Sequence, residues 1–315
     1  MTVGLPLSNR PDPAHLVPST FGSPGVPAAF GPPSGGRPPR QPPGPGKFLV
    51  VLLVLLGLVA AGLQTLPMFN PALPAPVPES AQPSSATPSA SATARAGGTA
   101  NLLTNSRIYP LSVSGNCPRT QTPSGRAAYE KQVSTLLECL AGIFRPLVEQ
   151  AGGDFEPVRH RFYGTRTESP CGTARDAYAF YCETNATIYF SERVFRDSGY
   201  ARLVVADVVI HEYGHHVQAM MGILRAADEL SEDRATITRR QELQVFCWTY
   251  YVFAALPSFA LTVDDHSGFR QVWGSTDDPE GHGSVRAQEY WGPRGLAASE
   301  LGACNTWTVP ASRVR

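Results

Sequence analysis

The segment His211-Glu212-Tyr213-Gly214-His215 places two imidazoles and a carboxylate at a spacing that suits metal chemistry. On a helix, residues four apart lie on the same face about one turn from each other, so both histidines can bind one tetrahedral zinc ion. Zinc lowers the pKa of a bound water to about 7, and Glu212 can take its proton while hydroxide attacks a peptide carbonyl. The segment therefore predicts a zinc-dependent peptidase in which Glu212 is the general base.

Catalytic zinc needs a third protein ligand, and Glu242 is the best candidate. One class of enzymes with this motif takes a third histidine, but this chain has Gln218 and Met221 where that class requires glycine and histidine. Glu242 lies 27 residues after His215, in a strongly apolar segment that we expect to be a buried helix. The acidic residues between them form a polar cluster that we expect to be solvated: Asp228, Glu229, Glu232 and Asp233.

Three other histidines are not expected to bind this metal. On a helix, His216 is rotated by about 100° from His215, so it cannot share the metal, and we expect it either to support a metal ligand or to be structural. His160 and His266 have no partner at ligand spacing, and we expect them to be surface or core residues.

Hydrophobic patterning predicts an α+β domain that is mostly helical. Apolar periodicity predicts helices over residues 125–150, 200–221 and 239–256, the second of which carries the zinc motif. Aromatic and β-branched segments predict strands over residues 158–163, 178–182 and 187–190. The last two strands are expected to form a hairpin. The final strand is a candidate edge on which an extended peptide could pair through its main chain.

Composition separates a proline-rich N-terminal part from the part that can fold. The chain has 315 residues and 30 prolines, of which 20 precede residue 101, whereas all six cysteines and all four tryptophans follow it. Residues 1–47 have too few large apolar groups to form a core, so we expect a disordered tail, with binding of cytoplasmic partners as the alternative. Net charge is zero, which argues against a protein that binds nucleic acid.

A candidate transmembrane helix lies at residues 48–66, which are uncharged and apolar. At about 1.5 Å per residue, this run can cross a hydrocarbon core of about 30 Å. Arg37, Arg40 and Lys47 precede it, so the positive-inside rule places the N-terminus in the cytoplasm and the C-terminal domain outside the membrane. A cleaved signal peptide is the alternative, and it also exports the C-terminal part.

A linker and a folded domain follow the apolar run. Residues 67–106 are rich in Pro, Ala, Ser and Thr, which favours an extended tether before a domain over residues 107–315. The six cysteines of this domain fit three disulfides in an oxidising compartment, with buried free thiols as the alternative, and the sequence alone leaves their pairing open. No pair has the CxxC spacing of a zinc knuckle, so we do not expect cysteine to bind the metal.

Several short segments accompany the zinc motif in a distinctive order. They are Cys171, Phe180-Tyr181-Cys182, the motif segment 211–218, Glu242-Leu243-Gln244-Val245-Phe246-Cys247, His282-Gly283-Ser284 and Cys304-Asn305-Thr306. In this order and spacing they resemble a bacterial family of neutral zinc metallopeptidases, over roughly residues 107–310. The resemblance implies a zincin-like fold, with zinc bound by His211, His215 and Glu242 and with Glu212 as the base. It also implies the disulfides Cys171–Cys182 and Cys247–Cys304, which leaves Cys117 with Cys139.

The chain departs from the family pattern at two places. Phe246 replaces an aspartate that could orient a zinc-bound histidine, and losing such a partner typically costs about 10- to 100-fold in metal affinity or activity. Ala287-Gln288 replaces a Gln-Arg pair, so an arginine that could steady the substrate is missing. His282 is a candidate for stabilising the tetrahedral intermediate, with a structural hydrogen-bonding role as the alternative.

The sequence thus predicts a membrane-anchored, extracytoplasmic metallopeptidase that uses Zn²⁺ to hydrolyse a peptide or protein substrate. The alternative is a pseudopeptidase that binds an envelope protein or a wall component, which the two departures motivate. A third hypothesis is a structural anchor whose proline-rich tail recruits cytoplasmic partners.

Overall fold

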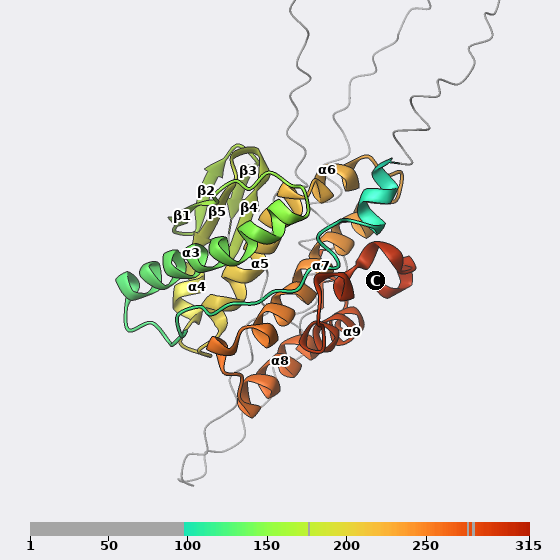
Figure 1. Cartoon of the computed structure of the whole chain (residues 1–315). Coiled ribbons are helices and arrows are strands. Elements are labelled where there is room, and N and C mark those ends of the chain that lie inside the picture. The colour runs from blue at the N-terminus through green and yellow to red at the C-terminus, as the bar shows by residue number, and fades with distance from the viewer. Residues whose placement is uncertain (1–97, 176, 276, 279–280) are drawn as a thin grey trace, which may run out of the picture. The chain divides into compact units, whose positions relative to one another are not determined.

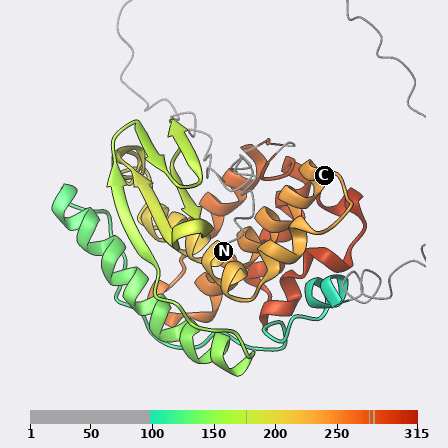
Figure 2. The same cartoon turned by 90° about the horizontal axis from the view of Figure 1, so that it is seen from above.

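The computed structural model describes residues 98–315 apart from positions 176, 276, 279 and 280. Residues 98–104 are helical, and the helices that follow are α3 (Arg126–Gln150), α4 (Glu192–Asp197), α5 (Val204–Met220), α6 (Ile223–Asp228), α7 (Arg234–Ala255), α8 (Val263–Ser275) and α9 (Val285–Leu296). Its strands are β1 (Arg159–Tyr163), β2 (Arg166–Ser169), β3 (Gly172–Arg175), β4 (Ala179–Cys182) and β5 (Thr187–Ser191). The strands gather at one side of α5, and α7, α8 and α9 pack together at the other (Figures 1 and 2). The predicted α+β class, mostly helical with a small sheet, is confirmed.

The main sheet has the order β1-β5-β4. Strand β5 pairs in parallel with β1, where Phe162 lies opposite Phe190, and antiparallel with β4, where Phe180 lies opposite Tyr189. The predicted hairpin is therefore confirmed. The prediction that residues 187–190 form an edge strand is wrong, because β1 covers the other side of β5. All five residues of β5 are buried, which is typical of a central strand.

Helices α5 and α7 pack face to face and carry most of the candidate site. Gly214 makes the contact close, because a Cβ atom there would lie only 2.6 Å from Cγ1 of Val245. Helix α7 is buried on nearly all sides, as its apolar sequence predicts. It begins at Arg234 rather than at the predicted residue 239, since the carboxylate of Asp233 accepts the backbone N–H of Thr236 and caps the first turn.

The acidic cluster between α5 and α7 lies away from the zinc motif. Asp228, Glu229 and Asp233 are exposed, as predicted from their polar surroundings in the sequence. Glu232 forms an ion pair with the buried Arg240 of α7 at 2.8 Å, and that guanidinium also donates to the carbonyl of Val309 at 3.0 Å. Part of the cluster thus ties the C-terminal segment to α7.

Three disulfides cross-link the described residues. They are Cys117–Cys139, Cys171–Cys182 and Cys247–Cys304, which are the pairs that the family resemblance implies. All six cysteines are paired.

Across residues 98–315, with the gaps given above, no helix combines the length and the apolar composition that crossing a bilayer requires. The predicted span at residues 48–66 and the predicted tail at residues 1–47 lie outside the described residues, as does the linker up to residue 97.

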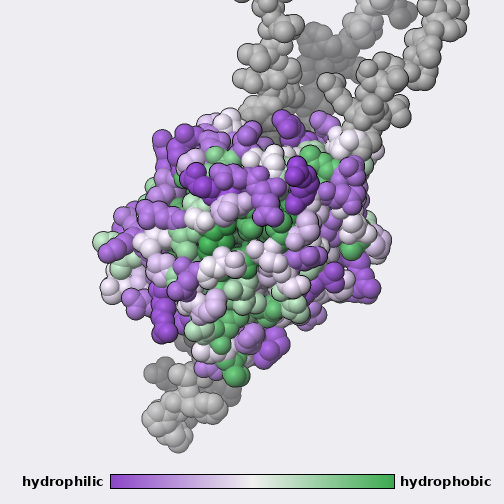
Figure 3. Space-filling model, in the orientation of Figure 1, coloured by the Kyte–Doolittle hydropathy of each residue, from purple (hydrophilic) through white to green (hydrophobic). Residues whose placement is uncertain are grey.

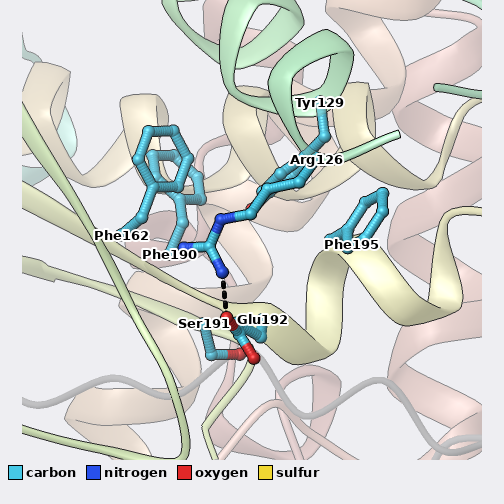
Figure 4. Close-up of a pocket in the computed structure, with 7 residues that line it drawn as sticks. All are labelled: Arg126, Tyr129, Phe162, Phe190, Ser191, Glu192 and Phe195. Carbon is cyan, nitrogen blue, oxygen red and sulfur yellow. Dashed lines mark hydrogen bonds and ion pairs between the residues drawn. The ribbon is translucent and has the colours of Figure 1, made fainter. Parts of the chain in front are cut away.

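An aromatic hollow lies between α3, the sheet and α4, and its lining residues are labelled in Figure 4. The ring centroid of Tyr129 is 5.5 Å from those of Phe162 and Phe195, and Arg126 forms an ion pair with Glu192 at the hollow. These contacts fasten α3 and α4 to the sheet. The lining contains none of the predicted site residues.

The surface is polar over much of the face seen in Figure 3, with apolar residues gathered toward its middle. Among the described residues, the exposed large apolar side chains are Tyr200 and Val263, which lie just before α5 and at the start of α8. Neither is part of the zinc motif.

Candidate metal centre

His211 and His215 lie one turn apart on α5, and both contact Glu242 of α7. Their ring centroids are 5.0 Å apart. Nε2 of His211 is 3.2 Å from Oε2 of Glu242, and Nε2 of His215 is 3.5 Å from the same oxygen. Glu242 is only 1% exposed. The structure thus brings together the three residues that the sequence predicts as zinc ligands.

His282, which lies in the segment before α9, joins the same group. Its Nε2 atom is 3.4 Å from Oε2 of Glu242. Potential ligand atoms of His211, Glu242 and His282 all lie within 4.8 Å of one another. This group of three contains His282 rather than His215, although His215 also contacts Glu242. The geometry therefore permits two roles for His282, at the substrate or at the metal.

Asp278 orients His282. Its Oδ2 atom is 2.7 Å from Nδ1 of His282, and the hydrogen bond to that ring lowers the pKa of Asp278 to about 2. The carboxylate is therefore ionised at neutral pH and accepts a hydrogen bond from the N–H group at Nδ1 of His282. As a result, Nε2 of His282 faces Glu242.

The buried polar atoms at this centre fit a cation. Within the part of the chain that the structure describes, Nε2 of His215, Nε2 of His282 and Oε1 of Glu242 are buried without a hydrogen-bond partner. One such atom costs about 1–3 kcal/mol, so three at one point favour a bound ion that uses their lone pairs. Imidazole nitrogens and a carboxylate oxygen are the ligands of catalytic zinc.

The electrostatics also favour a positive charge here. Burial raises the pKa of Glu242, but the charges of His215 and His282 and the hydrogen bond from His211 outweigh burial and hold it well below its ordinary value. Burial lowers the pKa of His211 to about 4, so this imidazole is neutral, which is the form that binds metal. Burial also lowers the pKa of His215, but the carboxylates of Glu242 and Glu212 outweigh it and raise the value to about 9.

Glu212 is completely buried on α5, next to the first histidine of the motif. Its carboxylate is close enough to His215 to contribute to the raised pKa of that ring. This position agrees with the predicted general base, which must lie beside the metal ligands.

Phe246 stands where the family pattern has an aspartate, and it cannot accept a hydrogen bond from a histidine. Phe246 packs edge-on against Tyr250, with ring centroids 4.9 Å apart. Nδ1 of His211 has no hydrogen-bond partner among residues 98–315 as described.

Asp207, one turn before His211 on α5, is half-buried, and burial raises the pKa of its carboxyl to about 7.

The second departure from the family pattern has a structural explanation. Ala287 is buried in the first turn of α9, and Gln288 donates to the carbonyl of Gly283 at 3.3 Å. Gly283 has φ of +85°, a conformation that favours glycine. Gln288 therefore supports the turn that carries His282. It is neutral and cannot supply the positive charge of the arginine that the family pattern has at this position.

The other histidines of the described residues lie outside the group around Glu242. His216 contacts the hydroxyl of Tyr181 at 3.1 Å and the carbonyl of Glu156 at 2.7 Å, so both of its ring nitrogens have partners away from Glu242. His160 is 3.1 Å from the hydroxyl of Ser134, and His266 contacts Phe269.

Three further polar residues near the centre, Gln218, Gln244 and Asp278, are not predicted as site residues from the sequence. Gln218 contacts His215 through Oε1, which lies 3.0 Å from Nδ1. Its spacing of three residues from His215 was the available signal, because such residues are neighbours on a helix. Asp278 precedes His282 by four residues, but it lies outside a helix, so spacing alone did not indicate the contact.

The sequence model of a family described as "Putative neutral zinc metallopeptidase" matches residues 115–307, which is more than half of the 315 residues. The chain belongs to this family. All the zinc-site residues discussed above lie inside the matched region. The resemblance seen in the short motifs is therefore confirmed.

The curated relatives of this metallopeptidase family member are themselves described as uncharacterized. Rv2575 of Mycobacterium tuberculosis is 26% identical over 181 residues, covering 47% of this chain and 62% of that protein. YpfJ of Escherichia coli K12 is 23% identical over 206 residues, covering 56% of this chain and 71% of that protein. The match thus spans less than two thirds of the mycobacterial relative. No solved structure matches the chain significantly.

Proposed function

We propose that this protein is a zincin-like metallopeptidase in which His211, His215 and Glu242 hold zinc and Glu212 is the general base. The observation that carries the proposal is the convergence of both motif histidines on Oε2 of the buried Glu242. Membership of a zinc metallopeptidase family supports the choice of metal and of peptide substrates. The substrate is a peptide or a protein.

The chain's own residues can carry the proton transfers of peptide hydrolysis. Zinc bound at this centre would act as a Lewis acid and lower the pKa of water to about 7. Glu212 accepts a proton from the attacking water and passes it to the leaving amine. His282 is held through Nδ1 by Asp278, and in its protonated form the ring donates from Nε2 to the negative charge that develops on the substrate carbonyl oxygen.

The test compares the full-length wild type with a Glu212→Gln variant, both purified in detergent, on a mixed peptide library. We expect cleavage by the wild type that a chelator abolishes and that added Zn²⁺ restores. The variant should bind zinc as the wild type does, but it should cleave about 10²- to 10⁴-fold more slowly, because it lacks the base. Equal cleavage by both proteins would contradict the role of Glu212.

A second candidate function is a catalytically impaired pseudopeptidase that binds an envelope protein or a wall component. The observation that favours it is Phe246, which offers no hydrogen-bond acceptor at the position where the family pattern has an aspartate. In the same digestion, a wild type that holds zinc stoichiometrically and cleaves no peptide would support this candidate.

The proposal includes a single-pass membrane anchor at residues 48–66, with the N-terminus in the cytoplasm and the metal centre outside. The apolar run and the paired cysteines support it. Protease added to intact spheroplasts should remove the C-terminal domain and leave an N-terminal fragment. Full protection of the domain, with digestion only after lysis, would contradict this orientation.

A further inference from the structure

Gln218 contacts the ring nitrogen of His215 that does not face Glu242. Oε1 of Gln218 is 3.0 Å from Nδ1 of His215. Both side chains are buried, and Gln218 is completely so. Because an amide oxygen only accepts hydrogen bonds, Nδ1 must carry the proton if this contact is a hydrogen bond.

The other contacts of Gln218 fix the orientation of its amide. Its Nε2 atom donates to the backbone carbonyl of Gln241 at 3.0 Å and to Oε1 of Gln244 at 2.9 Å. A carbonyl can only accept, so a rotated amide would place two oxygens together at Gln241. The nitrogen of Gln218 therefore faces α7, and its oxygen faces His215.

The same direction of donation continues beyond Gln244. Nε2 of Gln244 donates to the hydroxyl of Tyr109 at 3.1 Å, and this hydroxyl donates to the carbonyl of Leu103 at 2.9 Å. In the series from His215 through Gln218, Gln244 and Tyr109 to the carbonyl of Leu103, here called the amide relay, each side chain donates to the next member. Buried hydrogen bonds aligned in this way reinforce one another.

We infer that Gln218 and Gln244 are positioning residues that hold His215 with its proton on Nδ1 and its Nε2 lone pair directed at the metal. The inference rests on the proposed function, because it takes His215 as a zinc ligand. A partner on the outer nitrogen of a ligand histidine fixes its tautomer and its ring orientation, and raises its affinity for metal. The relay also links the centre to residues 103–109, which precede α3.

The experiment measures zinc affinity by chelator competition in full-length variants purified in detergent. Gln218→Met keeps the length of the side chain but removes the acceptor, so its zinc affinity should fall about 10- to 100-fold. Gln218→Glu keeps an acceptor for Nδ1 and should bind zinc more tightly than Gln218→Met. Gln244→Met breaks the relay one bond further away, so its loss should be smaller than that of Gln218→Met.

Thr249→Val is the matched control. Thr249 is a buried polar residue of α7 whose hydroxyl donates to the backbone carbonyl of Val245 at 3.0 Å. Its replacement should change stability without changing zinc affinity. If replacing any buried polar residue between α5 and α7 weakened zinc binding, Thr249→Val would lower zinc affinity as Gln218→Met does.

A second readout is the protonation state of His215, from long-range ¹H–¹⁵N correlations of the zinc-loaded, ¹⁵N-histidine-labelled protein. The wild type should show a proton on Nδ1 and metal on Nε2, and Gln218→Met should lose this defined state. Metal on Nδ1 of His215, or equal zinc affinity in the wild type and Gln218→Met, would overturn the inference alone. A wild type that binds no zinc would overturn the proposed function and the inference together.

Discussion

Oε2 of Glu242 lies 3.2 Å from Nε2 of His211, although the two residues are 31 positions apart. The contact depends on the close packing of α5 against α7, which Gly214 permits at Val245. One residue without a side chain thus controls how near the glutamate approaches the motif histidines.

Gly214→Ala should therefore disturb both the fold and the metal centre. The new Cβ would lie 2.6 Å from Cγ1 of Val245, and such overpacking costs about 1–3 kcal/mol. The gain in helix propensity, about 1 kcal/mol, offsets part of this loss. We expect a lower free energy of unfolding in urea titrations and weaker zinc binding, since α7 must move away from α5.

Val245→Ala supplies the control for that change, because it removes the atoms that the new methyl group would meet. A double-mutant cycle should give a favourable coupling of about 1 kcal/mol between the two substitutions. Simple additivity of the two destabilisations would show that Gly214 is not needed for the approach of the helices.

Phe246→Asp should strengthen zinc binding. The carboxylate would stand on α7 one turn after Glu242, where it could accept the Nδ1 proton of His211. We expect a zinc affinity about 10-fold higher than that of the wild type, together with a lower melting temperature from lost contact with Tyr250. Phe246→Leu, which loses the ring without adding a charge, should bind zinc as the wild type does. The prediction fails if both variants have the same zinc affinity.

Local patterns in the sequence predict the parts of the site that lie within one helix. The spacing of His211 and His215 places both on one face of α5, and the apolar sequence around Glu242 indicates a buried helix. The position of His282 beside Glu242 was not predictable, because it follows from a non-helical segment between α8 and α9. The edge-strand prediction failed for a similar reason, since pairing of β1 with β5 joins segments more than 20 residues apart.

Asp207 should make stability depend on pH. Burial raises the pKa of its carboxyl from 3.8 to about 7, so the folded state binds this proton more tightly than the unfolded state does. The wild type should therefore lose about 2 kcal/mol relative to Asp207→Asn as pH rises from about 4 to about 7, after allowance for partial exposure. The measurement is the difference between the urea unfolding curves of the two zinc-free proteins. A constant difference across this range would contradict the raised pKa.

His282→Gln should separate the two roles that the geometry permits. If His282 stabilises charge on the substrate, we expect kcat to fall about 10²- to 10³-fold while zinc affinity changes little. Asp278→Asn should give a smaller loss of the same kind, since it removes only the group that orients the ring. A loss of zinc affinity in His282→Gln comparable to that of His211→Gln would instead identify His282 as a metal ligand.

Metal analysis of the full-length, oxidised protein is the most direct test of the zinc site formed by α5 and α7. The protein would be equilibrated with Zn²⁺, freed of unbound metal by gel filtration and measured by mass spectrometry beside a Glu242→Leu variant that retains its fold by circular dichroism. We predict one zinc per wild-type chain and substantially less in the variant. A folded wild type with no stoichiometric zinc, or equal zinc in both proteins, would contradict the account.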